Sequence, residues 1–102
     1  MKNFLKHTLI IALNMMVLCG NAQNYHIEGT VTDSLTRKSL AFVNITINND
    51  GHLGTTTDID GNFTINSRTA VNTLTFSYVG YFTKTIDVSK SGGKIRVKMK
   101  QD

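Results

Sequence analysis

The chain has 102 residues, a formal net charge of +4, no proline, no tryptophan and one cysteine. This length accommodates one domain, and a single cysteine excludes a fold held together by internal disulfides. Nine of the eleven Lys and Arg residues and all seven acids follow residue 22. The charge excess in that part is too small to indicate a nucleic-acid-binding protein.

Residues 1–22 have the layout of a secretory signal peptide. Lys2 and Lys6 precede an apolar run over 9–19, and Gly20 and Ala22 supply the small residues of a cleavage site. The run is shorter than the roughly 20 apolar residues that a membrane-spanning helix needs. We therefore expect cleavage after Ala22 and an exported protein, placed in the periplasm, at the outer membrane or outside the cell.

Cys19 leaves a second route of processing open. Bacterial lipoproteins are cleaved just before an acylated cysteine, usually after a small residue, and Leu18 occupies that place here. An acyl chain contributes about 0.8 kcal/mol per buried methylene to membrane attachment. The alternatives to a signal peptide are thus a lipid anchor at Cys19 or a buried N-terminal helix.

Beyond residue 23 the chain alternates polar and apolar residues in short stretches and has no helical periodicity. Period-two alternation is typical of half-buried strands. Short strands spaced by about 8–12 residues favour a sandwich of two sheets. We predict an all-β, seven-stranded antiparallel sandwich over residues 23–102, with strands at 25–33, 40–48, 52–57, 62–66, 71–78, 81–88 and 94–100.

The central stretch, residues 54–65, is typical of a strand, a tight turn and a second strand. Asp58-Ile59-Asp60-Gly61 supplies the turn, because Asp side chains bond downstream N–H groups and glycine adopts positive φ. Phe63 and Ile65 then share one face of the following strand. Gly29, inside the first stretch, indicates a bulge or a close approach of two backbones. Residues 48–51, Asn-Asn-Asp-Gly, predict another tight turn.

Three motifs resemble those of carboxypeptidase regulatory-like domains: residues 27–33, 54–63 and 74–81. They occur in the family's order and spacing. The resemblance implies a transthyretin-like Greek-key sandwich. Such domains are common in exported Bacteroidetes proteins, beside metallocarboxypeptidase domains or at the N-terminus of TonB-dependent outer-membrane receptors. Their usual role there is to support folding or to dock a neighbouring domain or chain.

One run departs from the family pattern. Before the second strand the family usually carries a proline and a glycine, as in a PLPGV-like sequence. Residues 39–43 are Ser-Leu-Ala-Phe-Val and contain neither residue. This departure affects the expected conformation of the loop and leaves the expected fold unchanged.

The alternation of Asp58, Asp60 and Asn62 around a glycine is similar to a calcium-binding loop. An EF-hand loop also needs an acid at its twelfth position, and that position is Thr69. We expect these side chains to stabilise the hairpin turn, and no cofactor. A calcium site completed by another loop, for example by Asp50, is the alternative.

The sequence contains no recognisable catalytic constellation. His26 and His52 are the histidines beyond residue 22, and a zinc site needs three or four converging ligands. No serine has the G-x-S-x-G context, and no glycine-rich phosphate loop is present. We therefore expect a protein that is not an enzyme.

Two surface features are candidates for binding. Phe42, Tyr78 and Tyr81 are predicted to form an aromatic interaction patch, the alternative being that the rings cap the core. The last strand carries Lys or Arg at alternate positions from 94 to 100. This row favours a solvated edge that discourages strand pairing, the alternative being a basic strip for an acidic partner.

These observations predict an exported, non-enzymatic accessory domain that presents strands and loops to a protein partner in the cell envelope. We expect no nucleic-acid partner, and membrane contact only through that partner or a lipid at Cys19. The alternatives are a carbohydrate- or calcium-binding module and a detached N-terminal fragment of a TonB-dependent receptor.

Overall fold

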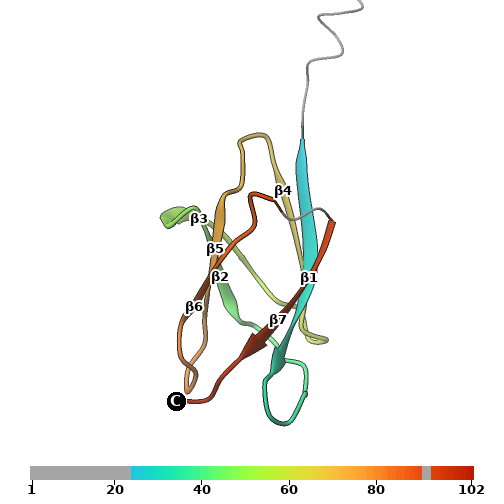
Figure 1. Ribbon diagram of the computed structural model, residues 1–102, viewed down its shortest axis with the longest axis vertical. Coiled ribbons are helices and arrows are strands. Elements are labelled where there is room, and N and C mark those ends of the chain that lie inside the picture. Colours follow the sequence, from blue (N-terminus) through green and yellow to red (C-terminus); the bar gives the residue numbers. More distant parts are fainter. Residues whose placement is uncertain (1–23, 91–92) are drawn as a thin grey trace, which may run out of the picture.

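The computed structural model describes residues 24–90 and 93–102 (Figure 1). The predicted signal peptide and the alternative at Cys19 lie outside these residues. In the described part, no helix is long and apolar enough to cross a membrane. The strands are β1 (Tyr25–Asp33), β2 (Asn44–Ile47), β3 (Asp50–Thr56), β4 (Asn62–Ser67), β5 (Thr73–Ser77), β6 (Lys84–Asp87) and β7 (Gly93–Met99).

The strands form two sheets that face one another, which confirms the predicted sandwich. One sheet has the order β4-β1-β7 and the other β3-β2-β5-β6 (Figure 1). The expectation of a wholly antiparallel fold is wrong for one pair, because β1 and β7 run parallel, from Ile27 opposite Gly93 to Asp33 opposite Met99. These are the first and last strands, so no hairpin forces them to be antiparallel.

The core lies between the sheets and takes alternate side chains from most strands. Phe63 of β4 meets Phe76 of β5 edge to face, with ring centroids 5.6 Å apart. This contact joins the two sheets and confirms the inward face predicted for Phe63 and Ile65. The buried apolar residues are Ile27, Val31, Leu40, Val43, Ile45, Ile47, Phe63, Ile65, Val71, Leu74, Phe76, Val88, Val97 and Met99.

Gly29 of β1 lies where a neighbouring backbone and an aromatic ring both approach it closely. A Cβ at this position would be 2.7 Å from Cζ of Phe63 and would collide with the carbonyl oxygen of Ile95. The predicted close approach is therefore confirmed. Glycine is required here by the space between β7 and Phe63.

The turn predicted at 48–51 is also confirmed. Asn48 and Asn49 have φ values of 53° and 56°, the left-handed pair that a two-residue type I′ hairpin turn requires. Oδ1 of Asn48 accepts a 2.7 Å hydrogen bond from the backbone N–H of Asn72. The β2–β3 turn is thereby tied to the residues that precede β5.

Three predicted strands are shorter than expected. The strand predicted over 40–48 begins only at Asn44, because Phe42 has a φ of 62°, which no extended strand accommodates. The prediction of a strand that includes Phe42 is therefore wrong. The stretches predicted at 71–78 and 81–88 contract to β5 and β6, since a corner at Gly80, with φ of 88°, separates them.

Candidate functional site

Three connections and the carboxyl end of the chain lie at one end of the sandwich. The connections are residues 34–43 between β1 and β2, 57–61 between β3 and β4, and 78–83 between β5 and β6. In Figure 1 they occupy the lower part of the view, where the C-terminus is marked. We call this region, with residues 100–102, the loop end.

The loop end carries most of the exposed large apolar side chains of the described residues. Their exposed fractions range from 51% for Phe82 to 95% for Val79. Two further exposed apolar side chains, Tyr25 and Leu53, belong to β1 and β3. Exposed apolar side chains that gather in one region indicate a binding surface more strongly than scattered ones do. Those of the loop end are Leu35, Phe42, Ile59, Val79 and Phe82.

Thr57 fixes the loop that carries Phe42. Its side chain is buried, and its hydroxyl donates a 2.7 Å hydrogen bond to the carbonyl of Leu40. The same Oγ1 accepts a 2.9 Å bond from the N–H of Val43. The N–H of Phe42 donates to the carbonyl of Thr57 at 3.0 Å. Three hydrogen bonds to one residue thus hold both sides of Phe42 in place.

Asp33 ties the other parts of the loop end together. Its Oδ1 accepts hydrogen bonds from the N–H groups of Leu35 and Thr36, at 2.8 and 2.9 Å. Its Oδ2 accepts from the hydroxyl of Tyr81 at 2.6 Å and from Nε2 of Gln101 at 2.7 Å. The buried carboxylate therefore joins the end of β1, the β5–β6 connection and the carboxyl end.

These hydrogen bonds shift the pKa values of Asp33 and Tyr81 in opposite directions. The hydroxyl of Tyr81, followed by the other donors, holds the pKa of the Asp33 carboxyl well below its ordinary value of 3.8. The carboxylate in turn raises the pKa of the Tyr81 hydroxyl above 10.0, because the hydrogen bond needs the proton. No local pattern in the sequence indicated the contacts with Tyr81 and Gln101, since these residues lie far from Asp33 in the chain.

Phe42 combines a strained backbone with an exposed ring. Its φ of 62° lies in the left-handed region, which costs a bulky residue about 1–2 kcal/mol. Its side chain is 65% exposed, so the ring contributes little to the core. A glycine would adopt this conformation without that cost. The phenylalanine therefore carries an energetic cost that packing of this fold does not offset.

The other two residues of the predicted aromatic patch are placed differently. Tyr78 and Tyr81 are half-buried and pack against the core, with ring centroids 5.6 Å apart. The hydroxyl of Tyr81 is engaged by Asp33. The two tyrosines thus help to build the loop end, whereas Phe42 projects from it.

Asp58, Asp60 and Asn62 surround the β3–β4 turn. Oδ1 of Asp58 accepts hydrogen bonds from the N–H groups of Asp60 and Asn62, at 2.9 and 2.8 Å. The Asp58 side chain thus stabilises the turn in the manner expected from the sequence. Among residues 24–90 and 93–102, no group of three or more His, Cys, Asp or Glu side chains is arranged to hold a metal ion.

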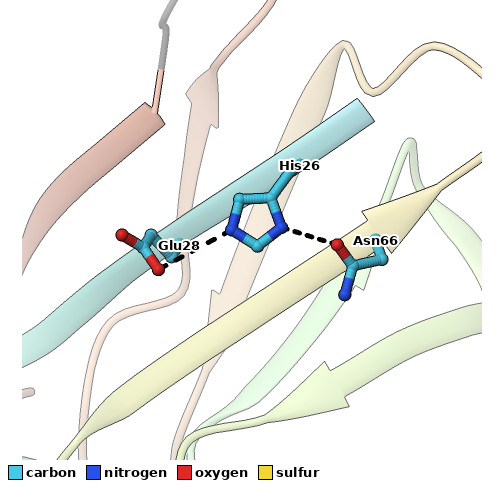
Figure 2. A network of polar contacts seen from close by, with 3 residues as sticks. All are labelled: His26, Glu28 and Asn66. Atoms are coloured by element: carbon cyan, nitrogen blue, oxygen red, sulfur yellow. Dashed lines mark hydrogen bonds and ion pairs between the residues drawn. The ribbon is translucent and has the colours of Figure 1, made fainter. Parts of the chain in front are cut away.

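The outer face of the three-stranded sheet is polar. Figure 2 shows the ring of His26 between Glu28 and Asn66. Nδ1 of His26 lies 2.6 Å from Oδ1 of Asn66, and Nε2 lies 3.7 Å from Oε2 of Glu28. His52, the other histidine that the sequence singled out, is exposed on β3 of the opposite sheet. The two histidines therefore do not share a sheet.

A groove on the same outer face is lined by cations and threonines. It has a volume of about 460 Å³. Three of its cations come from the row in β7 that the sequence revealed, and one, Arg37, comes from the loop between β1 and β2. No sequence periodicity connects Arg37 to that row. The basic groove is lined by Thr30, Thr32, Arg37, Lys94, Arg96 and Lys98.

Two of the solved structures that resemble this chain illustrate how distant the likeness is. The pilus 2b backbone protein of group B streptococcus has a TM-score of 0.47 and 15% identity, with 74% of this chain and 40% of that chain covered. A DUF3823 family protein from Parabacteroides merdae also has a TM-score of 0.47, with 16% identity and coverage of 79% and 47%.

Sequence comparison is more informative. The chain is 36% identical over 84 residues to TonB-dependent receptor P3 of Formosa agariphila. The aligned region covers 82% of this chain and 8% of the receptor. The chain thus spans less than a tenth of that relative's length. The family described as CarboxypepD_reg-like domain matches residues 27–102. The chain belongs to the CarboxypepD_reg-like domain family, as its three motifs indicated.

Proposed function

We propose that this chain is a non-catalytic docking module that holds its loop end against an apolar surface of a receptor-type protein in the cell envelope. Membership of the CarboxypepD_reg-like domain family supports a non-catalytic role. The 36% identity to part of a TonB-dependent receptor supports the envelope as its place of action. Most of that receptor lies outside the matched segment, which supports a module that acts beside a larger protein.

The observation that carries the proposal is Phe42. Backbone strain tends to persist where a function requires it and the surroundings enforce it. Here the hydrogen bonds to Thr57 enforce the conformation, and the ring points away from the core. A glycine would remove the strain and leave the core unchanged. The exposed ring is therefore best explained by a contact outside the fold.

The chemistry of the loop end indicates the chemistry of its partner. The loop end exposes five large apolar side chains, Phe42 among them, alongside polar ones, and its frame is fixed by Asp33 and Thr57. A preorganised apolar surface loses little conformational entropy on binding. Aromatic residues in such surfaces commonly dominate the binding energy. The partner surface is therefore apolar, with a recess that accepts the ring of Phe42.

Site-specific photo-crosslinking tests this proposal. A benzophenone side chain is placed at position 42 of the full chain in cells, and in a matched variant at Leu53, which is exposed on β3 outside the loop end. We expect irradiation to link position 42, and not position 53, to a defined envelope protein. Equal labelling from both positions, or no discrete adduct from position 42, would contradict the proposal.

A further inference from the structure

The basic groove has a regular geometry. Lys94, Arg96 and Lys98 point outward from β7 at every second position, which places them about 6.6–6.8 Å apart along the strand. In the parallel register, Arg96 lies opposite Thr30 and Lys98 lies opposite Thr32 of β1. The groove therefore presents an evenly spaced row of positive charges beside a row of hydroxyl groups.

The charges of this row are not neutralised within the described residues. The ion pair among the described residues joins Nε2 of His26 to Oε2 of Glu28, which are 3.7 Å apart, and it includes no cation of the groove. Acids opposite the cations would stabilise the sheet, because opposite charges on neighbouring strands attract. Threonines occupy two of those places, and Glu28, opposite Lys94 at the far end of the row, lies next to His26. The positive potential of the groove is thus left available to a ligand.

Arg37 adds a fourth cation from a different element. Its φ of 62° places it in the left-handed region, where glycine or asparagine is more usual. The N–H of Arg37 donates a 2.9 Å hydrogen bond to the carbonyl of Asp33, which closes the turn after β1. A strand edge that merely stays solvated needs no cation from a separate turn. Arg37 therefore distinguishes a binding groove from a protective row of lysines.

We propose that the basic groove binds an extended acidic polypeptide segment that carries carboxylates at alternate positions. An extended chain repeats its side chains with the same spacing as Lys94, Arg96 and Lys98, so each carboxylate meets one cation. The lining contains no aromatic ring on which bases could stack and no apolar side chain that could enter a bilayer. This surface lies outside the apolar side chains of the loop end, and the inference goes beyond the proposed docking function.

Fluorescence anisotropy with labelled peptides tests the inference on the full chain. The probe is a peptide of alternating Glu and Thr, compared with a peptide of the same composition whose Glu residues form one block. The groove variant is Lys94→Gln, Arg96→Gln, Lys98→Gln. The matched control is Lys38→Gln, Arg68→Gln, Lys90→Gln, which removes the same charge from exposed positions outside the groove.

We expect the groove variant to bind the alternating peptide about tenfold more weakly, because each exposed ion pair contributes a few-fold. The control variant should stay within about twofold of the wild type at a salt concentration that screens distant charges. The alternating peptide should bind more tightly than the block peptide. All three substituted side chains of the groove variant are exposed, so its thermal unfolding should match that of the wild type.

Several outcomes would overturn the inference. Equal loss of affinity in the groove and control variants would show that net charge alone attracts the peptide. Equal binding of the alternating and block peptides would show that the spacing of the cations does not select the ligand. Tighter binding of single-stranded DNA, or of vesicles containing phosphatidylglycerol, would assign the groove to another class of ligand. Phe42→Gly should leave peptide affinity unchanged, which separates this test from that of the loop end.

Discussion

The hydroxyl of Tyr81 donates a 2.6 Å hydrogen bond to Oδ2 of Asp33, and this contact joins the corner after β5 to the end of β1. Nε2 of Gln101 donates to the same oxygen at 2.7 Å. Three segments that are distant in the sequence therefore meet at one buried carboxylate. The contact gives the loop end a fixed frame beneath its exposed apolar side chains.

The hydrogen bonds to Asp33 make the stability of the fold depend on pH in the acid range. The pKa of Asp33 is lowered in the folded protein, so the unfolded chain takes up a proton near the ordinary value of 3.8 and the folded chain resists it. This contribution is complete above the unfolded value and is lost as pH falls below it. Asp87, whose pKa Ser89 lowers, contributes with the same sign. We expect the Tm to fall as the pH is lowered from neutrality to below the ordinary value.

Tyr81→Phe provides the control for this dependence. It removes the largest cause of the lowered pKa of Asp33 and leaves the ring in place. The variant should have a lower Tm than the wild type at neutral pH, and its Tm should fall less when the pH is lowered. Scanning calorimetry across the acid range measures both effects. Parallel curves for the two proteins would show that the contact with Tyr81 does not set this pH dependence.

Phe42→Gly should stabilise the fold. Glycine removes the backbone strain of a left-handed residue, which is about 1–2 kcal/mol. Part of this gain in stability is lost, because glycine raises the conformational entropy of the unfolded chain. We expect a net gain of about 0.5–1 kcal/mol in the free energy of unfolding. Phe42→Ala, which keeps the penalty, should show no gain. Urea denaturation compares the three proteins, and equal stabilisation by alanine would mean that strain is not the cause.

Thr57→Val should destabilise the loop that positions Phe42. The change leaves the carbonyl of Leu40 and the N–H of Val43 buried without their partner, at a cost of about 1–3 kcal/mol. Thr56→Val is the matched control, because Thr56 is exposed on the edge strand β3 and should tolerate the change. Urea denaturation measures the difference. Equal effects at the two positions would argue against a specific role for the Thr57 hydroxyl.

Calcium should leave the Tm of the wild type unchanged at millimolar concentration. Oδ1 of Asp58 accepts two backbone hydrogen bonds, and among the described residues no group of three or more His, Cys, Asp or Glu side chains is arranged to supply the ligands that calcium needs. Asp58→Asn keeps a side-chain oxygen that can accept these hydrogen bonds and removes the negative charge. Calcium should therefore leave the Tm of this variant unchanged as well. A rise in the Tm of the wild type that Asp58→Asn abolishes would instead establish a calcium site at this turn.

Local patterns in the sequence were sufficient to predict the sandwich. Alternation at period two identified the strands, and Asn48 and Asn49 identified a hairpin turn that the structure confirms. The parallel pairing of β1 with β7 was not predictable, because it joins the two ends of the folded chain. Neither strand carries a signal that specifies the direction of its partner, since a half-buried strand shows the same alternation in both arrangements.

The candidate site was predictable only in part. Phe42 and the cations of β7 stood out by their residue type and spacing. The backbone strain of Phe42 was not visible, because φ depends on the loop as a whole. Arg37 and Asp33 were missed for a related reason. Their roles arise from contacts with residues far along the chain, and in the sequence an aspartate at the end of a strand resembles any solvated aspartate.

The most direct test of the docking account is the affinity of wild type and Phe42→Gly for the protein that crosslinks at position 42, measured by surface plasmon resonance. We predict that Phe42→Gly binds about tenfold or more weakly, as loss of a central aromatic contact of about 1.4 kcal/mol or more requires, although it is the more stable fold. Undiminished affinity in Phe42→Gly would contradict the account.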